Sequence, residues 1–320
     1  MSDLNLVFTG CKNTTYECMK AVLGMGVPID LLITISPETA EKNKVAGYYD
    51  LRKFAEENSI RTYVCNSYTL KTNEDIENLN KYNFNVLLVI GWQRLIPEWL
   101  LSKLKTGAFG MHGSSRPLPY GRGRSPMNWS IIQNRTIFIT NLFKYNKDVD
   151  SGEIIATETF DINPFDTAQT MHYKNMLAMV KILKSNINDI LDNNLLLKPQ
   201  LNIIPSYYPK RNAEDGIIFW DRDTGEIYNL IRAVTKPFHG AFTFYKDKKI
   251  IIWQAFPFDT RLFDPEIESG TVLEALLNSD FVVKTGSDSM IVTNYETIGF
   301  DKVERGMLFN NSNYVYKCPY

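Results

Sequence analysis

The stretch NVLLVIGWQRLIPEWLLSKLKTGAFGM, residues 85–111, carries the pattern that decides the fold. Residues 85–90 form a nearly continuous apolar run, which is typical of a strand buried on both faces of a parallel sheet. A short amphipathic segment at 97–105 follows, and residues 108–111 form a second apolar run. Two buried strands joined by a helical segment predict a βαβ unit.

The same alternation of strands and helices extends on both sides of this stretch. We expect strands and helices at these positions: strands 4–9, 29–35, 61–65, 137–145 and 153–160, and helices 14–23, 48–58, 72–82, 126–133 and 166–190. The pattern predicts an α/β fold, a Rossmann-like and mostly parallel sheet with helices on both faces. The turn after the first strand reads FTGCKN, not GxGxxG, which argues against an NAD or FAD enzyme.

The pattern changes from about residue 206. Short β-type runs at 249–256, 270–277 and 289–295 are separated by Gly, Asp and Asn, with one helical stretch at 224–234. This texture predicts a small β-rich, barrel-like domain. We therefore predict two domains, a catalytic domain at 1–205 and a β-rich domain at 206–320.

Composition narrows the class of protein. The net charge of −1 gives no overall field for nucleic acid or an anionic membrane, and no secretory signal or membrane-spanning run is visible. The cysteines lack CxxC spacing, which argues against structural zinc and favours reduced thiols; they are Cys11, Cys18, Cys65 and Cys318. We expect a cytoplasmic protein.

The chemistry is concentrated in residues 107–152. His112 follows a strand of the parallel sheet at its carboxyl end, where open α/β sheets bind their ligands. A loop rich in Gly, Pro and Arg follows it, and Asp150 lies in the turn DVDSG. A carboxylate beside an imidazole favours the imidazolium and fixes its tautomer. Taken singly, a packed histidine and a turn-forming aspartate are the alternative interpretations.

Three motifs in this region resemble the formyltransferase family: HGS at 112–114, LPYGRGRSP at 118–126 and DSG at 150–152. That family includes methionyl-tRNA, glycinamide ribonucleotide and sugar-nucleotide N-formyltransferases, and the resemblance spans about 84–256. It implies 10-formyltetrahydrofolate as the formyl donor, an amine as acceptor and no metal. It also implies that His112 stabilises the tetrahedral oxyanion or relays a proton, while Asp150 orients His112.

The segment IGWQRLIP, residues 90–97, is similar to the family's folate pocket. The resemblance assigns cofactor binding to Trp92, Gln93, Arg94, Leu95, Ile96, Val149 and Asp150. The main chain of residues 94–96 would bond the pterin-like ring, and that of residues 149–150 would close the pocket.

One position departs from the family, whose centre reads Asn-x-His. Here Gly110 replaces the asparagine whose amide donates to the oxyanion. Side chains alternate along a strand, so Asn141 and Phe143 should share a face directed towards His112. We hypothesise that the Asn141 amide supplies the missing donor; a polar residue on a solvated strand face is the alternative.

Acceptor binding is assigned to Ser114, Arg116, Tyr120, Arg122, Arg124, Tyr207, Tyr208 and Arg211. The three loop arginines suit an acceptor phosphate, although they could equally form a solvated basic loop. The segment YYPKR at 207–211 is similar to the formyltransferase module for UDP-4-amino-4-deoxyarabinose. Its aromatic residues suit stacking, or alternatively they fill a domain junction.

The choice of acceptor depends partly on charge. From residue 209 onward the chain has 16 acidic and 13 basic residues, so the net charge of this part is negative, whereas binding to tRNA phosphates requires a positive surface. We predict a nucleotide-linked amino sugar, dTDP-4-amino-4,6-dideoxyhexose, used in surface polysaccharide such as lipopolysaccharide O-antigen. Alternatives are a methionyl-tRNA formyltransferase, a folate-binding protein that has lost its activity and a formate-releasing hydrolase. A homodimer is expected by analogy with sugar-modifying relatives.

Overall fold

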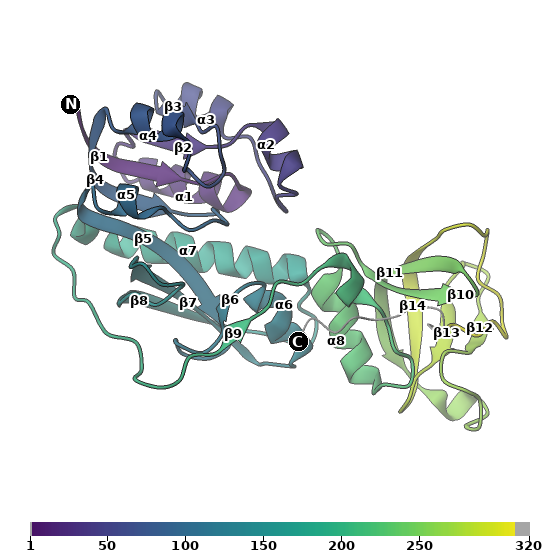
Figure 1. Ribbon diagram of the computed structural model, residues 1–320. Coiled ribbons are helices and arrows are strands. Elements are labelled where there is room, and N and C mark those ends of the chain that lie inside the picture. Colours follow the sequence, from purple (N-terminus) through teal and green to yellow (C-terminus); the bar gives the residue numbers. More distant parts are fainter. Residues whose placement is uncertain (1, 311–320) are drawn as a thin grey trace. The chain divides into compact units, whose positions relative to one another are not determined.

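The computed structural model describes residues 2–310, which divide into two compact units (Figure 1). Unit 1 comprises Met1–Gly123, Ile137–Asp161 and Tyr173–Tyr207. Unit 2 comprises Arg124–Thr136, Ile162–His172 and Tyr208–Tyr320. Each unit draws on more than one stretch of sequence, and the domain boundary at 205/206 stays a prediction.

Unit 1 is built on a seven-stranded sheet in the order β3-β2-β1-β4-β5-β7-β8. The first five strands in this order are parallel, and β7 and β8 are antiparallel. The mostly parallel sheet predicted from the alternating pattern is thus confirmed. The bounds are β1 Ser2–Thr9, β2 Leu31–Thr34, β3 Arg61–Val64, β4 Tyr82–Val89, β5 Leu104–Ser114, β7 Ile137–Lys144 and β8 Ile154–Asp161.

Helices pack on both faces of this sheet, as predicted. One hydrophobic cluster joins the sheet to α1 (Asn13–Leu23), α3 (Arg52–Glu57) and α7 (Ala168–Leu191). A second cluster, on the opposite face, joins it to α2 (Pro37–Lys42), α4 (Asn73–Leu79) and α5 (Glu98–Leu101). Strand β4 contributes buried side chains to both clusters, which explains its nearly continuous apolar sequence.

Unit 2 contains a five-stranded antiparallel sheet in the order β10-β11-β14-β13-β12 (Figure 1). Its elements are α6 Pro126–Ile132, α8 Thr224–Val234, β10 Ala241–Tyr245, β11 Lys248–Phe258, β12 Val272–Ala275, β13 Phe281–Lys284 and β14 Ser289–Thr297. Helix α6 packs on α8, where Asn128 Nδ2 donates to Ala233 O at 2.6 Å. The predicted β-rich C-terminal domain is confirmed.

Some expected elements are shorter in the structure. The helix predicted at 97–105 ends at Leu101, because Leu104 already pairs with Phe84 in the sheet. The helix predicted at 48–58 begins only at Arg52, because the N–H of Tyr49 bonds to Cys11 O instead of continuing a helix. Short elements complete the chain: β6 Arg122–Gly123, β9 Tyr207–Tyr208, η1 Ala213–Gly216 and η2 Thr260–Leu262.

Three of the four cysteines are buried free thiols, Cys11, Cys18 and Cys65, whereas Cys318 lies outside the described residues. Within residues 2–310, no three His, Cys, Asp or Glu side chains are grouped so that they could hold a metal ion. No helix in that range combines the length and apolar character needed to cross a bilayer.

The core of unit 1 should respond strongly to a cavity at β4. We expect Leu88→Ala to lower the free energy of unfolding by about 2–5 kcal/mol, because Leu88 is fully buried. Urea unfolding measures the loss, and Leu177→Ala, at a position that is 62% exposed, is the matched control. Equal effects of the two substitutions would contradict this account of the core.

Candidate functional site

His112 and Asp150, predicted to form a pair, do meet in the structure. His112 lies near the carboxyl end of β5, and Asp150 lies in the turn after β7. Nδ1 of His112 is 3.4 Å from Oδ2 of Asp150, and the two side chains are only 9% and 19% exposed. The carboxylate and the imidazole therefore face each other in a part of the unit that is largely removed from water.

The other ring nitrogen of His112 faces a loop carbonyl. Nε2 lies 2.8 Å from Gly121 O. A carbonyl oxygen only accepts, so this contact requires a hydrogen on Nε2. Both ring nitrogens therefore face acceptors, and His112 is arranged to donate through Nε2.

The turn that carries Asp150 is tightly specified. Asp150 has φ +48°, a left-handed conformation that aspartate tolerates better than most residues, and its Oδ2 accepts from Gly123 N–H at 3.0 Å. A Cβ on Gly152 would lie 1.6 Å from Lys144 O, so only glycine fits there. The spacing Asp-x-Gly is thus a packing requirement of this turn.

Gln200 ties this turn to the loop after β5, and sequence reasoning missed it. Its Nε2 donates to Asp150 O at 2.8 Å and to Gly152 O at 2.9 Å. Its Oε1 accepts from Arg122 Nη2 at 2.6 Å. Gln200 lies in a connecting segment without periodicity, so no signal in the sequence indicates this role.

Asn141 lies directly opposite His112 in the β5–β7 register and is almost fully buried. Its Nδ2 is 3.4 Å from the main-chain oxygen of His112, and its Oδ1 accepts from Thr157 Oγ1 at 3.0 Å. The predicted proximity to His112 is therefore present. The catalytic role assigned to the amide stays a prediction.

The predicted pterin-binding residues form the loop between β4 and α5. The Trp92 ring packs edge-on against Tyr68 at 4.5 Å, and its buried Nε1 makes no hydrogen bond within the described residues. Arg94 stacks its guanidinium over Tyr68 and donates to Gln93 O, while Tyr68 accepts from Gln93 N–H. Ile96 is buried, and Leu95 is exposed.

The main chain of this loop offers unused polar groups. Within the described part of the chain, the N–H and C=O groups of residues 94–96 form no hydrogen bond to other residues. Of the other two residues assigned to the pocket, Val149 is exposed, whereas the Asp150 carbonyl is already bonded to Gln200. The loop thus has donors and acceptors for a flat polar ring beside Trp92, and closure by residues 149–150 stays a prediction.

The predicted acceptor-binding residues fall into both units. In unit 1, the Arg116 guanidinium lies over the Tyr120 ring at 4.3 Å, and Ser114 is buried. Arg122 donates to Gln200 and, through Nη1, to the hydroxyl of exposed Tyr207 at 3.3 Å. Both terminal nitrogens of the Arg122 guanidinium, Nη1 and Nη2, thus already donate a hydrogen bond within unit 1.

In unit 2 the corresponding group is centred on Trp129, which was not predicted. The Tyr208 ring stacks on it at 5.9 Å, and the Arg211 guanidinium lies 4.9 Å from its centroid. The N–H of Arg124 donates to Tyr208 O, so its main chain, too, belongs to this group. Trp129 lies in the predicted helix at 126–133, where an aromatic residue looks like ordinary core.

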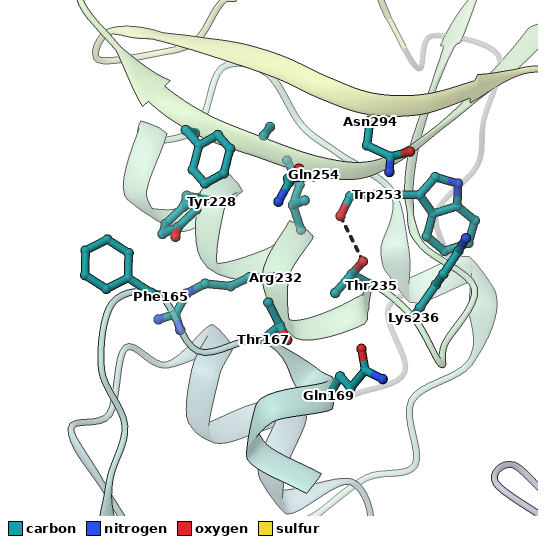
Figure 2. A pocket seen from close by; sticks show the side chains of 13 residues that line it. Phe165, Thr167, Gln169, Tyr228, Arg232, Thr235, Lys236, Trp253, Gln254 and Asn294 are labelled. Atoms are coloured by element: carbon teal, nitrogen blue, oxygen red, sulfur yellow. Dashed lines mark hydrogen bonds between the residues drawn. The ribbon is translucent and has the colours of Figure 1, made fainter. Parts of the chain in front are cut away.

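A separate cavity of about 280 Å³ lies within unit 2 and contains none of the predicted site residues (Figure 2). Its most buried cation, Arg232, bonds to Asn229 and to the main-chain oxygens of Asn163 and Asp166. Lys236 lies over the Trp253 ring. Arg232 thus anchors the segment at 163–166 to helix α8. The buried cation of this cavity therefore has a structural role and needs no ligand to account for it.

Loss of the Gln200 side chain should loosen the Asp150 turn. We expect Gln200→Ala to raise hydrogen–deuterium exchange in residues 146–152 and 120–124 by about tenfold or more, because three hydrogen bonds of roughly 0.5–1.5 kcal/mol each disappear. Gln254→Ala, at an exposed position in unit 2, is the control. Unchanged exchange would show that Gln200 does not hold the turn.

Two family models match the sequence. The model described as "Formyl transferase" matches residues 7–186, and the one described as "Formyl transferase, C-terminal domain" matches residues 210–311. A curated relative, the bifunctional polymyxin resistance protein ArnA of Wigglesworthia glossinidia brevipalpis, is 35% identical over 180 residues. That match covers 56% of this chain but only 27% of the relative, so the chain spans about a quarter of that protein's length.

Solved structures show the same fold. An N-formyltransferase from Helicobacter canadensis, in complex with folinic acid and dTDP-3-aminofucose, has a TM-score of 0.66 at 20% identity, covering 92% of this chain and all of that chain. A methionyl-tRNA formyltransferase from Clostridium thermocellum has a TM-score of 0.54 at 19% identity, covering 85% and 99%. The likeness extends over both units of the chain.

Proposed function

Because the chain belongs to the formyl transferase family, we propose that it transfers a formyl group from 10-formyltetrahydrofolate to the amine of a nucleotide-linked amino sugar. The observation that carries this proposal is the pair formed by His112 and Asp150 at the carboxyl end of β5. No other histidine of the chain adjoins a loop of such Gly, Pro and Arg content.

The loop at 92–96 supports a folate as the donor. Among residues 2–310, the buried indole N–H of Trp92 and a run of main-chain groups have no hydrogen-bond partner, and such groups suit the donors and acceptors of a pterin ring. The Helicobacter canadensis protein of similar fold was crystallised with folinic acid. Trp92, Arg94 and Ile96 would hold the ring, and the formyl group would extend towards His112.

The residues present can support each step of the transfer. The amine nitrogen attacks the formyl carbon, a tetrahedral oxyanion forms, and the bond from that carbon to the folate nitrogen breaks as the amine proton leaves. Nε2–H of His112 donates to the oxyanion, a contact that strengthens as charge develops. Asp150 balances the positive ring, and water beside its carboxylate carries the proton from the amine to the departing folate nitrogen, which leaves as the neutral N–H compound.

A sugar nucleotide is favoured as acceptor on two grounds. First, the Helicobacter canadensis N-formyltransferase of similar fold was crystallised with dTDP-3-aminofucose, a nucleotide-linked amino sugar. The residues beyond 208 carry an acidic excess, which disfavours tRNA. We propose dTDP-4-amino-4,6-dideoxyhexose, with Arg116 and Arg122 of unit 1 as candidates for contact with its diphosphate.

The rest of the functional picture is part of the same proposal. Both substrates are soluble metabolites, so we place the reaction in the cytoplasm and its product in the assembly of a surface polysaccharide such as O-antigen. A homodimer stays a prediction.

The decisive assay offers 10-formyltetrahydrofolate with dTDP-, UDP- and GDP-linked 4-amino sugars, dTDP-linked 3-amino sugars and charged initiator tRNA. We expect a mass gain of one formyl group on a sugar nucleotide, and its loss in His112→Asn, because asparagine cannot carry the positive charge. His239→Asn, whose position is remote in sequence from the site motifs, is the control. Transfer to tRNA alone would overturn the acceptor, and transfer to none would overturn the proposed reaction.

Folate binding can be tested without an acceptor. We expect tetrahydrofolate to quench the fluorescence of Trp92, because the ring would lie against this side chain, and Trp92→Phe to remove most of that quenching. Trp253→Phe, which alters the separate cavity of unit 2, should leave the quenching in place. The same quenching in Trp92→Phe as in the wild type would place the folate elsewhere.

A further inference from the structure

The space left by the missing asparagine at position 110 is filled by another residue. An ideal Cβ on Gly110 would lie 2.3 Å from Cε1 and 2.6 Å from the hydroxyl oxygen of Tyr145. The edge of the phenol ring, including its hydroxyl, therefore occupies the volume that a side chain at 110 would take. The Tyr145 hydroxyl thus offers an O–H donor at the place where an asparagine at position 110 would offer its amide N–H.

The local structure fixes this arrangement. Strand alternation puts Asn141 and Phe143 on one face of β7, and Tyr145 follows directly after the strand ends at Lys144. The register sets Asn141 opposite His112 and Phe143 opposite Gly110. Tyr145 stacks on Phe143 at 5.3 Å, and its N–H donates to Ala108 O. The ring thus lies on the same face of the sheet as His112, close to the carboxyl end of β5.

The Tyr145 hydroxyl is available as a donor. Among the residues that the structure describes, it makes no hydrogen bond. Burial and the nearby Asp150 carboxylate both raise the pKa of Tyr145, in that order of importance, so the phenol keeps its proton at neutral pH. By contrast, the Asn141 amide is already engaged by His112 O and Thr157.

We propose that the Tyr145 hydroxyl, rather than the Asn141 amide, supplies the oxyanion donor that Gly110 lacks. This inference rests on the proposed formyl transfer. The phenol O–H donates a hydrogen bond to the formyl oxygen, which gains negative charge as the amine attacks its carbon. Tyr145 keeps its proton throughout, so its part in the reaction involves no net transfer of atoms or electrons.

Steady-state kinetics test the role. We expect Tyr145→Phe to lower kcat by about 10²–10³-fold with little change in the KM for the folate, because one oxyanion donor is lost and the ring remains. Asn141→Ala should reduce kcat much less. Tyr16→Phe removes a hydroxyl from the opposite hydrophobic cluster, where the ring packs on Phe54, and serves as the control. A Tyr145→Phe enzyme as active as Tyr16→Phe would overturn the proposal.

An infrared measurement gives a readout that needs no acceptor. The probe is 10-formyl-5,8-dideazafolate, a stable folate analogue, labelled with ¹³C at the formyl carbon. A hydrogen bond from Tyr145 lowers the stretching frequency of the bound formyl carbonyl, so we expect this frequency to rise in Tyr145→Phe. The same carbonyl frequency in Tyr145→Phe as in the wild type would overturn the proposal, even if the wild type formylates no acceptor. A difference in frequency between the two enzymes, without any formyl transfer by the wild type, would overturn only the proposed acceptor reaction.

An exchange of the two side chains tests the shared position. Gly110→Asn alone should be inactive, because its Cβ would collide with the Tyr145 ring. In Gly110→Asn/Tyr145→Ala the ring is absent, and we expect kcat at least tenfold above that of Tyr145→Ala. A double variant no faster than Tyr145→Ala would mean that a donor at this position does not serve the reaction.

Discussion

The antiparallel pairing of β7 with β5 is the constraint on which the site depends. Its register sets His112 opposite Asn141 and Gly110 opposite Phe143, and it delivers the chain to the turn that holds Asp150. A slip of one residue would turn every side chain of β7 to the other face of the sheet. Phe138 and Leu142, buried within unit 1, oppose such a slip because it would carry apolar side chains out of their contacts.

At position 110 a side chain from the neighbouring strand segment, Tyr145, takes the place of the side chain that glycine lacks. The Tyr145 side chain has only two torsions that place its ring, and the stack on Phe143 restricts them. The hydroxyl is thus held in place although it makes no hydrogen bond to any residue that the structure describes. In the proposed reaction, the donor that is lost with the asparagine is supplied by a residue thirty-five positions away in sequence. Such a pair requires both changes together, since the ring and an asparagine at 110 cannot occupy one space.

Sequence reasoning located those parts of the site that depend on local patterns. His112 follows an apolar strand and Asp150 sits in a recognisable turn, and the resemblance to the formyltransferase motifs linked the two. Tyr145 and Gln200 were missed because their roles come from contacts across the sheet and from an irregular connecting segment. The start of α7 also differs from the prediction: the helix expected at 166–190 begins at Ala168, where the N–H of Thr170 bonds to Thr167 Oγ1.

The hydrogen bond between His112 and the Gly121 carbonyl has a consequence for selectivity between ground state and transition state. A formyl oxygen that approaches Nε2 must displace an acceptor of nearly its own strength, so the exchange gives the bound substrate little net stabilisation. An oxyanion is a charged acceptor, and its hydrogen bonds are roughly twice as strong as those of a neutral carbonyl. It therefore displaces the Gly121 carbonyl from Nε2–H much more readily than the formyl oxygen does. In the proposed reaction the Gly121 carbonyl therefore competes with the neutral formyl oxygen for Nε2–H far better than it competes with the oxyanion. His112 would then contribute to the rate of transfer and hardly to the affinity for the substrate.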